Sequence, residues 1–143
     1  MLRRLLAALL FCIAAAVQAA PVVIASARVW PAAEYTRITL ESARPVGHTM
    51  LILKNPDRLV VDLDNVELGP ALKNLSAKIL AGDPYIKQVR AAYFKPGVVR
   101  MVIDLKSEVR PSLFALPPAG EYKHRLVLDV YPLHDQLMAL LDK

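Results

Sequence analysis

Arginine and aromatic residues occur close together at two separate places in this sequence. Guanidinium groups hold carboxylates through paired hydrogen bonds, and aromatic rings stack on the faces of sugars. The combination is therefore suited to binding an anionic glycan, and structural or solvated roles for the same residues are the alternative. The candidate ligand-binding residues are Arg28, Trp30, Tyr35, Arg37, Tyr85, Arg90, Tyr93 and Arg100.

Four aspartates offer a second chemistry, because paired carboxylates can cleave glycosidic bonds. They are Asp62, Asp64, Asp104 and Asp129. These acids belong to repeated strands that also carry arginines, and a nearby cation keeps a carboxylate ionised instead of leaving it protonated as a general acid. We therefore expect structural aspartates and no catalytic residue.

The other reactive residue types are too sparse for a metal site or a nucleophile. The three histidines, His48, His124 and His134, are widely separated and fit no metal-binding spacing. The only cysteine, Cys12, lies in an apolar leader, so the mature chain has neither a thiol nor a disulfide. None of the five glycines belongs to a phosphate-binding loop motif. No metal and no cofactor is predicted.

The elements that carry these residues follow one repeated pattern. A turn at Asn55-Pro56-Asp57 leads into a segment that alternates between a charged side and an aliphatic side, ending at Asp64. The same order of an arginine, three mostly apolar residues and an acid recurs at Arg37–Glu41, Arg100–Asp104 and Arg125–Asp129. Such alternation is typical of strands with one face in water and one face on a core. The sequence predicts an antiparallel all-β domain.

The chain also contains an internal duplication of four strands per copy. Strands are expected at 21–29, 35–42, 48–53 and 58–63, and again at 85–93, 98–105, 112–116 and 122–131. A single four-stranded sheet cannot cover both of its faces. We therefore predict two four-stranded sheets in a pseudo-twofold symmetric sandwich, with each half of the sequence supplying one sheet.

The crossover between the two halves has a different pattern. It places four aliphatic residues at helical spacing, namely Leu72, Leu75, Ile79 and Leu80. Gly69-Pro70 precedes this stretch and Gly82-Asp83-Pro84 follows it, as expected at helix ends. One short helix or a pair of turns is predicted here.

The repeated arginines and acids are expected to match across strands. Residues four apart on one strand are about 13 Å apart, whereas opposite residues on antiparallel neighbours are about 5 Å apart. The inward rows should provide most of the stability, because exposed ion pairs contribute only about 0.5 kcal/mol each. These rows are Ile38, Leu40, Leu59, Val61, Leu63, Met101, Ile103, Leu105, Leu126, Leu128 and Val130.

The N-terminus is typical of an export signal. Arg3 and Arg4 precede an apolar run of thirteen residues, and Val17-Gln18-Ala19 fits a signal-peptidase site. We predict a signal peptide at 1–19, a β domain at 20–132 and the start of a helical linker at 133–143. An uncleaved membrane anchor is the alternative, but the run is shorter than the roughly twenty residues of a membrane span. The arginine pair leaves both the twin-arginine and the general secretory route open.

Charge limits the partners of the exported chain. Cleavage of the leader lowers the formal charge from +5 to +3, with 16 basic and 13 acidic residues. This mild basic bias suits an anionic polymer but lacks the basic stripe of a nucleic-acid binder. We expect no nucleic-acid partner and no stable membrane span after cleavage.

Four segments of the chain form a recognisable set. They are Ala27-Arg28-Val29-Trp30, Tyr35-Thr36-Arg37-Ile38-Thr39-Leu40-Glu41, Asn55-Pro56-Asp57-Arg58-Leu59-Val60-Val61-Asp62-Leu63 and Gly82-Asp83-Pro84-Tyr85-Ile86. Together they resemble the AMIN domain, the amino-terminal module of exported N-acetylmuramoyl-L-alanine amidases. The resemblance runs from about residue 22 to residue 131. It implies a double-sheet domain in the periplasm that binds peptidoglycan and holds an attached zinc amidase at the division septum.

The resemblance also implies limits and further partners. The zinc ligands of the amidases belong to a catalytic module that is not in this sequence, so a non-catalytic cell-wall binding and septal targeting module is expected. Division-site envelope proteins are further expected partners. The same module occurs in type IV pilus secretins, and a protein-docking module of such an envelope assembly is therefore the alternative function.

Overall fold

The computed structural model describes residues 19–133 and residue 141, and most of these residues lie in strands. The strands are β1 (Val22–Pro31), β2 (Thr36–Ser42), β3 (Gly47–Leu53), β4 (Arg58–Asp64), β5 (Val66–Glu67), β6 (Ile86–Lys95), β7 (Val98–Leu105), β8 (Val109–Leu116) and β9 (His124–Pro132). The predicted signal peptide at 1–19 and linker at 133–143 lie outside the described residues, apart from residues 19, 133 and 141, and stay predictions.

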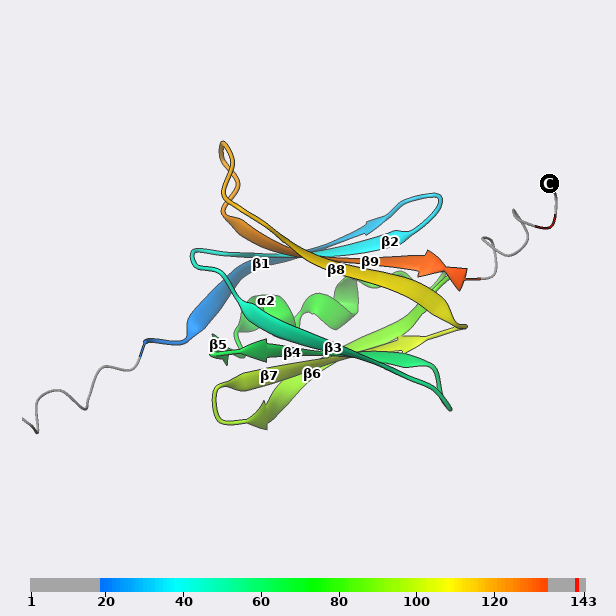
Figure 1. Cartoon of the computed structure of the whole chain (residues 1–143), viewed down its shortest axis with the longest axis horizontal. Coiled ribbons are helices and arrows are strands. Elements are labelled where there is room, and N and C mark those ends of the chain that lie inside the picture. Colours follow the sequence, from blue (N-terminus) through cyan, green and yellow to red (C-terminus); the bar gives the residue numbers. More distant parts are fainter. Residues whose placement is uncertain (1–18, 134–140, 142–143) are drawn as a thin grey trace, which may run out of the picture.

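The strands form two stacked, mainly antiparallel sheets, which confirms the predicted all-β sandwich (Figure 1). One sheet has the order β5-β1-β2-β9-β8, and the other has the order β3-β4-β7-β6. Four strands were predicted in each sheet. The additional strand is β5, whose two residues pair in parallel with Val22 and Val23 of β1.

The two halves of the sequence are interleaved, so the prediction that each half supplies one sheet was wrong. The β1-β2 hairpin of the first half pairs with the β8-β9 hairpin of the second half, and the remaining two hairpins form the other sheet. Alternation along a strand shows which side chains point inward, but it does not show which hairpin lies next to which. Both arrangements bury the same rows.

The duplication itself is confirmed by the strand order and register. The strands of the two sheets correspond one to one: β1 to β6, β2 to β7, β9 to β4 and β8 to β3. With these replacements, the order β1-β2-β9-β8 of one sheet becomes the order β6-β7-β4-β3 of the other. The central strand pairs are then equivalent: Arg37 lies opposite Asp129, and Arg100 lies opposite Asp62. Each arginine–acid pair of one sheet therefore has a counterpart in the other sheet.

The core lies between the sheets and is aliphatic. Every residue of the predicted inward rows is at most 8% exposed. Burying one such side chain contributes about 1.5–3 kcal/mol, several times the contribution of an exposed ion pair. The inward rows were predicted correctly, and on these magnitudes we expect the core to contribute most of the stability.

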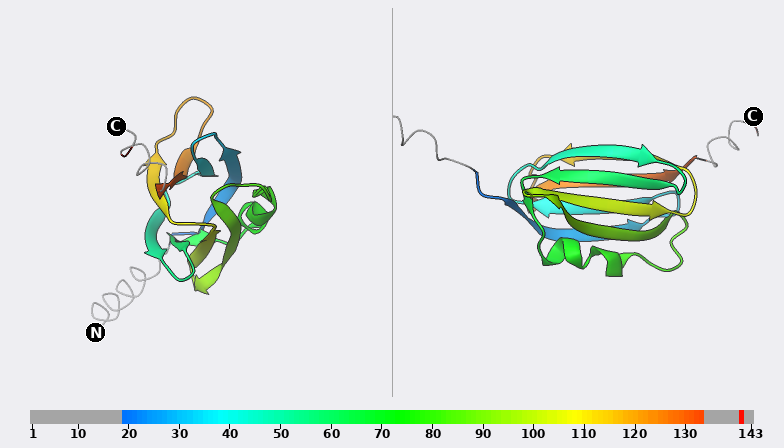
Figure 2. Two further views of the ribbon diagram at one scale, coloured as in Figure 1. Left: turned by 90° about the vertical axis from the view of Figure 1, so that its right-hand side faces the viewer. Right: turned by 90° about the horizontal axis from the view of Figure 1, so that it is seen from below.

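The crossover covers one open edge of the sandwich, beside β1 and β6 (Figure 2). It forms the short helix α2 (Pro70–Lys73) followed by the 3₁₀ helix η1 (Leu75–Lys78), which confirms the prediction of one short helix or a pair of turns. Leu72 and Leu75 are buried in the core, whereas Leu80 is 58% exposed and leaves the predicted apolar face. Within residues 19–133 and 141, no helix has the length and apolarity needed to cross a membrane.

Two prolines, Pro31 and Pro111, lie inside strands although both are outside the predicted strands at 21–29 and 112–116. β1 continues through Trp30 to Pro31, and β8 begins at Val109 and contains Pro111. Both prolines lie on strand edges without a ladder partner on one side, because β5 pairs with only the first residues of β1 and β8 ends its sheet. An edge position tolerates the missing N–H of proline. β8 is therefore longer than the predicted strand at 112–116.

Candidate ligand-binding pocket

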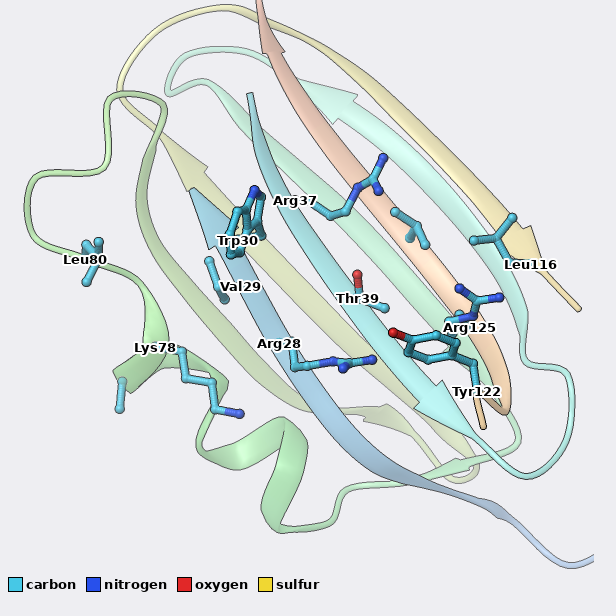
Figure 3. A pocket seen from close by; sticks show the side chains of 12 residues that line it. Arg28, Val29, Trp30, Arg37, Thr39, Lys78, Leu80, Leu116, Tyr122 and Arg125 are labelled. Atoms are coloured by element: carbon cyan, nitrogen blue, oxygen red, sulfur yellow. The ribbon is translucent and has the colours of Figure 1, made fainter. Parts of the chain in front are cut away.

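A pocket of about 650 Å³ lies on the outer face of the β1-β2-β9-β8 sheet (Figure 3). β1 contributes Arg28 and Trp30, and β2 contributes Arg37. The alternating strands of this sheet turn one row of side chains to solvent on this face and the other row to the core. The same alternation that builds the core thus places three of the predicted ligand residues in one pocket.

Two arginines of the pocket are held by acids on neighbouring strands. Arg37 makes a bidentate pair with Asp129, with Nε–Oδ1 at 2.7 Å and Nη2–Oδ2 at 2.8 Å. These hydrogen bonds raise the pKa of Arg37 above its usual value. Arg28 donates from Nη2 to Oε2 of Glu41 at 3.0 Å, and its side chain is 51% exposed. The pairs fix both guanidinium groups at the surface of the sheet.

Aromatic rings lie at both ends of this pocket. Trp30 is 66% exposed at the end of β1. Tyr122 lies at the opposite end, where the guanidinium of Arg125 lies 4.7 Å and that of Arg28 lies 5.9 Å from its ring centroid. Figure 3 shows Arg28 extending from β1 toward this ring. Exposed rings at the ends of a cationic hollow suit a ligand that combines flat apolar faces with anionic groups.

The crossover forms one wall of the pocket. Ala77, Lys78 and Leu80 follow the buried Leu75 and line the side next to β1. The ammonium group of Lys78 donates a hydrogen bond to the carbonyl oxygen of Ala27. Packing of the crossover against the core therefore also positions a fourth cation at the pocket.

The other predicted ligand residues do not reach this pocket. Arg90 and Arg100 lie on the second sheet, where they pair with Asp104 and Asp62 as the counterparts of Arg28 and Arg37. The eight candidates are thus divided between two outer faces. A single surface containing all of them does not form.

Three of the predicted aromatic residues have structural contacts. Tyr85 is only 8% exposed and belongs to the core, so its ring is not available to a ligand. The ring of Tyr35 lies 5.1 Å from that of Tyr131. Tyr93 is 53% exposed, and its hydroxyl accepts a hydrogen bond from the backbone N–H of Leu68.

Sequence reasoning missed several lining residues, chiefly Lys78, Tyr122 and Arg125. Arg125 belongs to a repeated strand motif, and its position opposite Glu41 follows once β2 is known to pair with β9. Lys78 and Tyr122 come from the crossover and a turn, which have no strand periodicity. Nothing in the sequence pattern indicates their approach to β1.

Three of the four candidate aspartates, Asp62, Asp104 and Asp129, pair with arginines on neighbouring strands. A bidentate hydrogen bond from Arg100 lowers the pKa of Asp62. Burial alone would raise the pKa of Asp104, but the hydrogen bonds from Arg90 and Gln88 outweigh it and lower this pKa. Lowered values keep both carboxylates ionised, so neither is suited to act as a general acid.

These ion pairs predict a loss of stability in acid. Because the folded-state pKa of Asp62 lies below the unfolded value of about 4, its contribution is complete above that value and is lost as the pH falls through the folded pKa. The urea unfolding midpoint should therefore stay level between about pH 7 and about pH 5 and fall below about pH 4. Asp62→Asn should reduce this fall, whereas Glu34→Gln, an exposed turn residue, should not. An unchanged fall in Asp62→Asn would contradict the assignment.

A metal site is not found in the described part of the chain. Across residues 19–133 and 141, no three residues among the histidines, cysteines, aspartates and glutamates gather closely enough to hold an ion. His48 instead places Nδ1 2.9 Å from the carbonyl oxygen of Val46. His134 lies outside the described residues.

Comparison with known proteins matches the same region of the chain. The family model of the AMIN domain matches residues 26–130. An N-acetylmuramoyl-L-alanine amidase, AmiC, of Escherichia coli is 47% identical over 124 residues, which cover 83% of this chain. AmiC of Neisseria meningitidis serogroup B is 46% identical over 121 residues, which cover 82% of this chain. The chain spans about 30% of the length of these curated relatives.

Proposed function

Because the chain belongs to the AMIN domain family, we propose that it is a non-catalytic module that binds peptidoglycan. The pocket on the β1-β2-β9-β8 sheet supports this proposal. It presents Arg28, Arg37 and Arg125 between two exposed rings, and its volume of about 650 Å³ suits a short stretch of a glycopeptide. The relatives are named as amidases of the N-acetylmuramoyl-L-alanine bond, which is a bond of peptidoglycan.

We further propose that the module works in the periplasm and concentrates an amidase at the division septum. The predicted signal peptide at 1–19 supports export by the twin-arginine or the general secretory route. The strands supply arginines and aromatic rings to the pocket, and the pKa values of Asp62 and Asp104 are lowered, which does not suit a general acid. Cleavage of peptidoglycan would therefore belong to a separate catalytic module, and this domain would hold that module at the septum.

Removing the cation and the ring at the β1 side of the pocket should abolish most of the binding. Arg28→Ala combined with Trp30→Ala should weaken cosedimentation with purified sacculi by about tenfold or more, because arginine and tryptophan dominate binding surfaces. Both side chains are largely exposed, so circular dichroism should be unchanged. The same variant, fused to a fluorescent protein, should lose septal enrichment.

A matched control comes from the second sheet. Lys87→Ala with Phe94→Ala also removes one cation and one exposed ring, but neither residue lines the pocket. This control should sediment like the unmodified domain. Equal losses in both variants would contradict the location of the site. If the unmodified domain stays in the supernatant at low salt, peptidoglycan binding is refuted and docking to an envelope protein becomes the better explanation.

A further inference from the structure

The pocket has more cations than acids. Arg28, Arg37, Lys78 and Arg125 line it, and only the first two pair with acids, namely Glu41 and Asp129. The other two cations contact backbone carbonyl oxygens: Lys78 bonds to Ala27, and Nη2 of Arg125 lies 3.3 Å from the carbonyl oxygen of Pro117. Among the described residues, Lys78 and Arg125 therefore form no ion pair with a carboxylate, although Glu41 lies opposite Arg125 on the neighbouring strand.

Arg125 is the clearest sign of a missing partner. Its Nε is buried and has no hydrogen-bond partner within the described residues. Leaving a buried donor unpaired costs free energy, and such a donor in a folded protein calls for an explanation. The guanidinium lies against the ring of Tyr122, 4.7 Å from its centroid, so the ring covers one of its faces. A carboxylate that binds an arginine edge through two oxygens would satisfy this donor after a small rotation of the side chain.

The chemistry of peptidoglycan restricts where such carboxylates can come from. In the intact N-acetylmuramoyl-L-alanine linkage, the carboxyl group of the muramoyl sugar forms an amide with L-alanine, so the sugar chain carries no charge. The ionised carboxylates are then on the attached peptide. Hydrolysis of that amide would free one carboxylate on each muramoyl sugar, which is a second source of the same group.

We propose that this pocket is a carboxylate site, which recognises ionised carboxylates of peptidoglycan and not its neutral sugar chain. The inference rests on the proposed function and adds the chemical class of the recognised group. Lys78 and Arg125 supply the cations that form no ion pair within the described residues, while Arg28 and Arg37 are held in place by their own acids. Trp30 and Tyr122 pack against the apolar parts of the same ligand.

Trp30 is the only tryptophan of the chain and lies at the pocket, so its fluorescence reports on this site. The full chain after leader cleavage is titrated with four probes: a neutral N-acetylglucosamine tetrasaccharide, a disaccharide tetrapeptide, the free tetrapeptide, and glycan stripped of peptide by an amidase. The disaccharide tetrapeptide should change the signal, and the neutral tetrasaccharide should not. A response to the free tetrapeptide assigns the carboxylate to the peptide, and a response to stripped glycan assigns it to the muramoyl sugar.

Arg125→Gln should weaken binding of the disaccharide tetrapeptide by about tenfold, because a charged hydrogen bond is lost. Lys87→Gln, an exposed cation outside the pocket, should leave it unchanged. Raising salt from about 50 mM to about 500 mM should weaken binding to the unmodified protein and have less effect on Arg125→Gln. Equal binding of the neutral tetrasaccharide, or full binding by Arg125→Gln, overturns the carboxylate site. Sacculi that fail to sediment the protein overturn the proposed function itself, so the two failures are distinguishable.

Discussion

Asp83→Ala should lower the free energy of unfolding by about 3 kcal/mol, because three buried donors lose their acceptor together. Asp83 is 2% exposed and joins the crossover to the sandwich. Its Oδ2 accepts a hydrogen bond from the hydroxyl of Thr36 on β2 at 2.8 Å. Its Oδ1 accepts the backbone N–H groups of Tyr85 and Ile86 at 2.9 and 2.8 Å, where β6 begins. Urea unfolding followed by circular dichroism measures the loss.

Two further variants separate this explanation from a general effect of charge. Asp83→Asn keeps one acceptor oxygen and should lose about half as much stability. Glu34→Ala removes an exposed acid from a turn and should change the stability by less than about 0.5 kcal/mol. If Asp83→Ala unfolds at the same urea concentration as Glu34→Ala, the carboxylate does not hold the crossover in place.

The sequence was most informative about which side chains point inward. Alternation along the strands correctly predicted the buried rows, because a side-chain period of two is a local property of the backbone. It also predicted that the repeated arginines and acids match across strands, but it did not identify the partners, which are Asp129 for Arg37 and Asp62 for Arg100. The other two repeated acids, Glu41 and Asp104, lie opposite arginines as expected but bond to Arg28 and Arg90 on the other neighbouring strand.

Contacts between distant segments were not predictable in the same way. Four similar hairpins can be joined in more than one order with the same buried rows, so the interleaving of the halves was missed. Tyr85 follows a turn and resembles the exposed tyrosines in its sequence surroundings, yet the crossover places it in the core. Lys78 reaches the pocket because Leu72 and Leu75 pack in the hydrophobic core and so hold the crossover against the sandwich. Such positions depend on tertiary packing, which no local pattern encodes.

The duplication provides a matched pair for the second stability prediction. Asp129 and Asp62 are equivalent by register, and each binds an arginine through two hydrogen bonds. Their burial differs, since the side chain of Asp129 is 3% exposed and that of Asp62 is 19% exposed. Removing one partner from a buried pair costs more than removing one from a pair that water reaches.

Asp129→Ala should therefore destabilise the domain by about 2 kcal/mol, which is less than for a fully buried pair because Arg37 still reaches water. Asp62→Ala should cost about 1 kcal/mol or less, and Arg100 keeps its contact 3.6 Å above the ring of Phe94. Urea unfolding of both variants measures the difference. Equal losses would show that burial of the acid does not decide the strength of these pairs.

The same two variants should also differ in binding, because Arg37 lines the pocket and Arg100 does not. Without Asp129 the guanidinium of Arg37 loses both hydrogen bonds that fix it on the sheet, although its charge remains. Asp129→Ala should then weaken cosedimentation with sacculi severalfold at a temperature where it is fully folded, and Asp62→Ala should leave it unchanged. Asp129 would thus be a positioning residue that acts through Arg37. Full binding by a folded Asp129→Ala domain would instead limit this acid to a structural role.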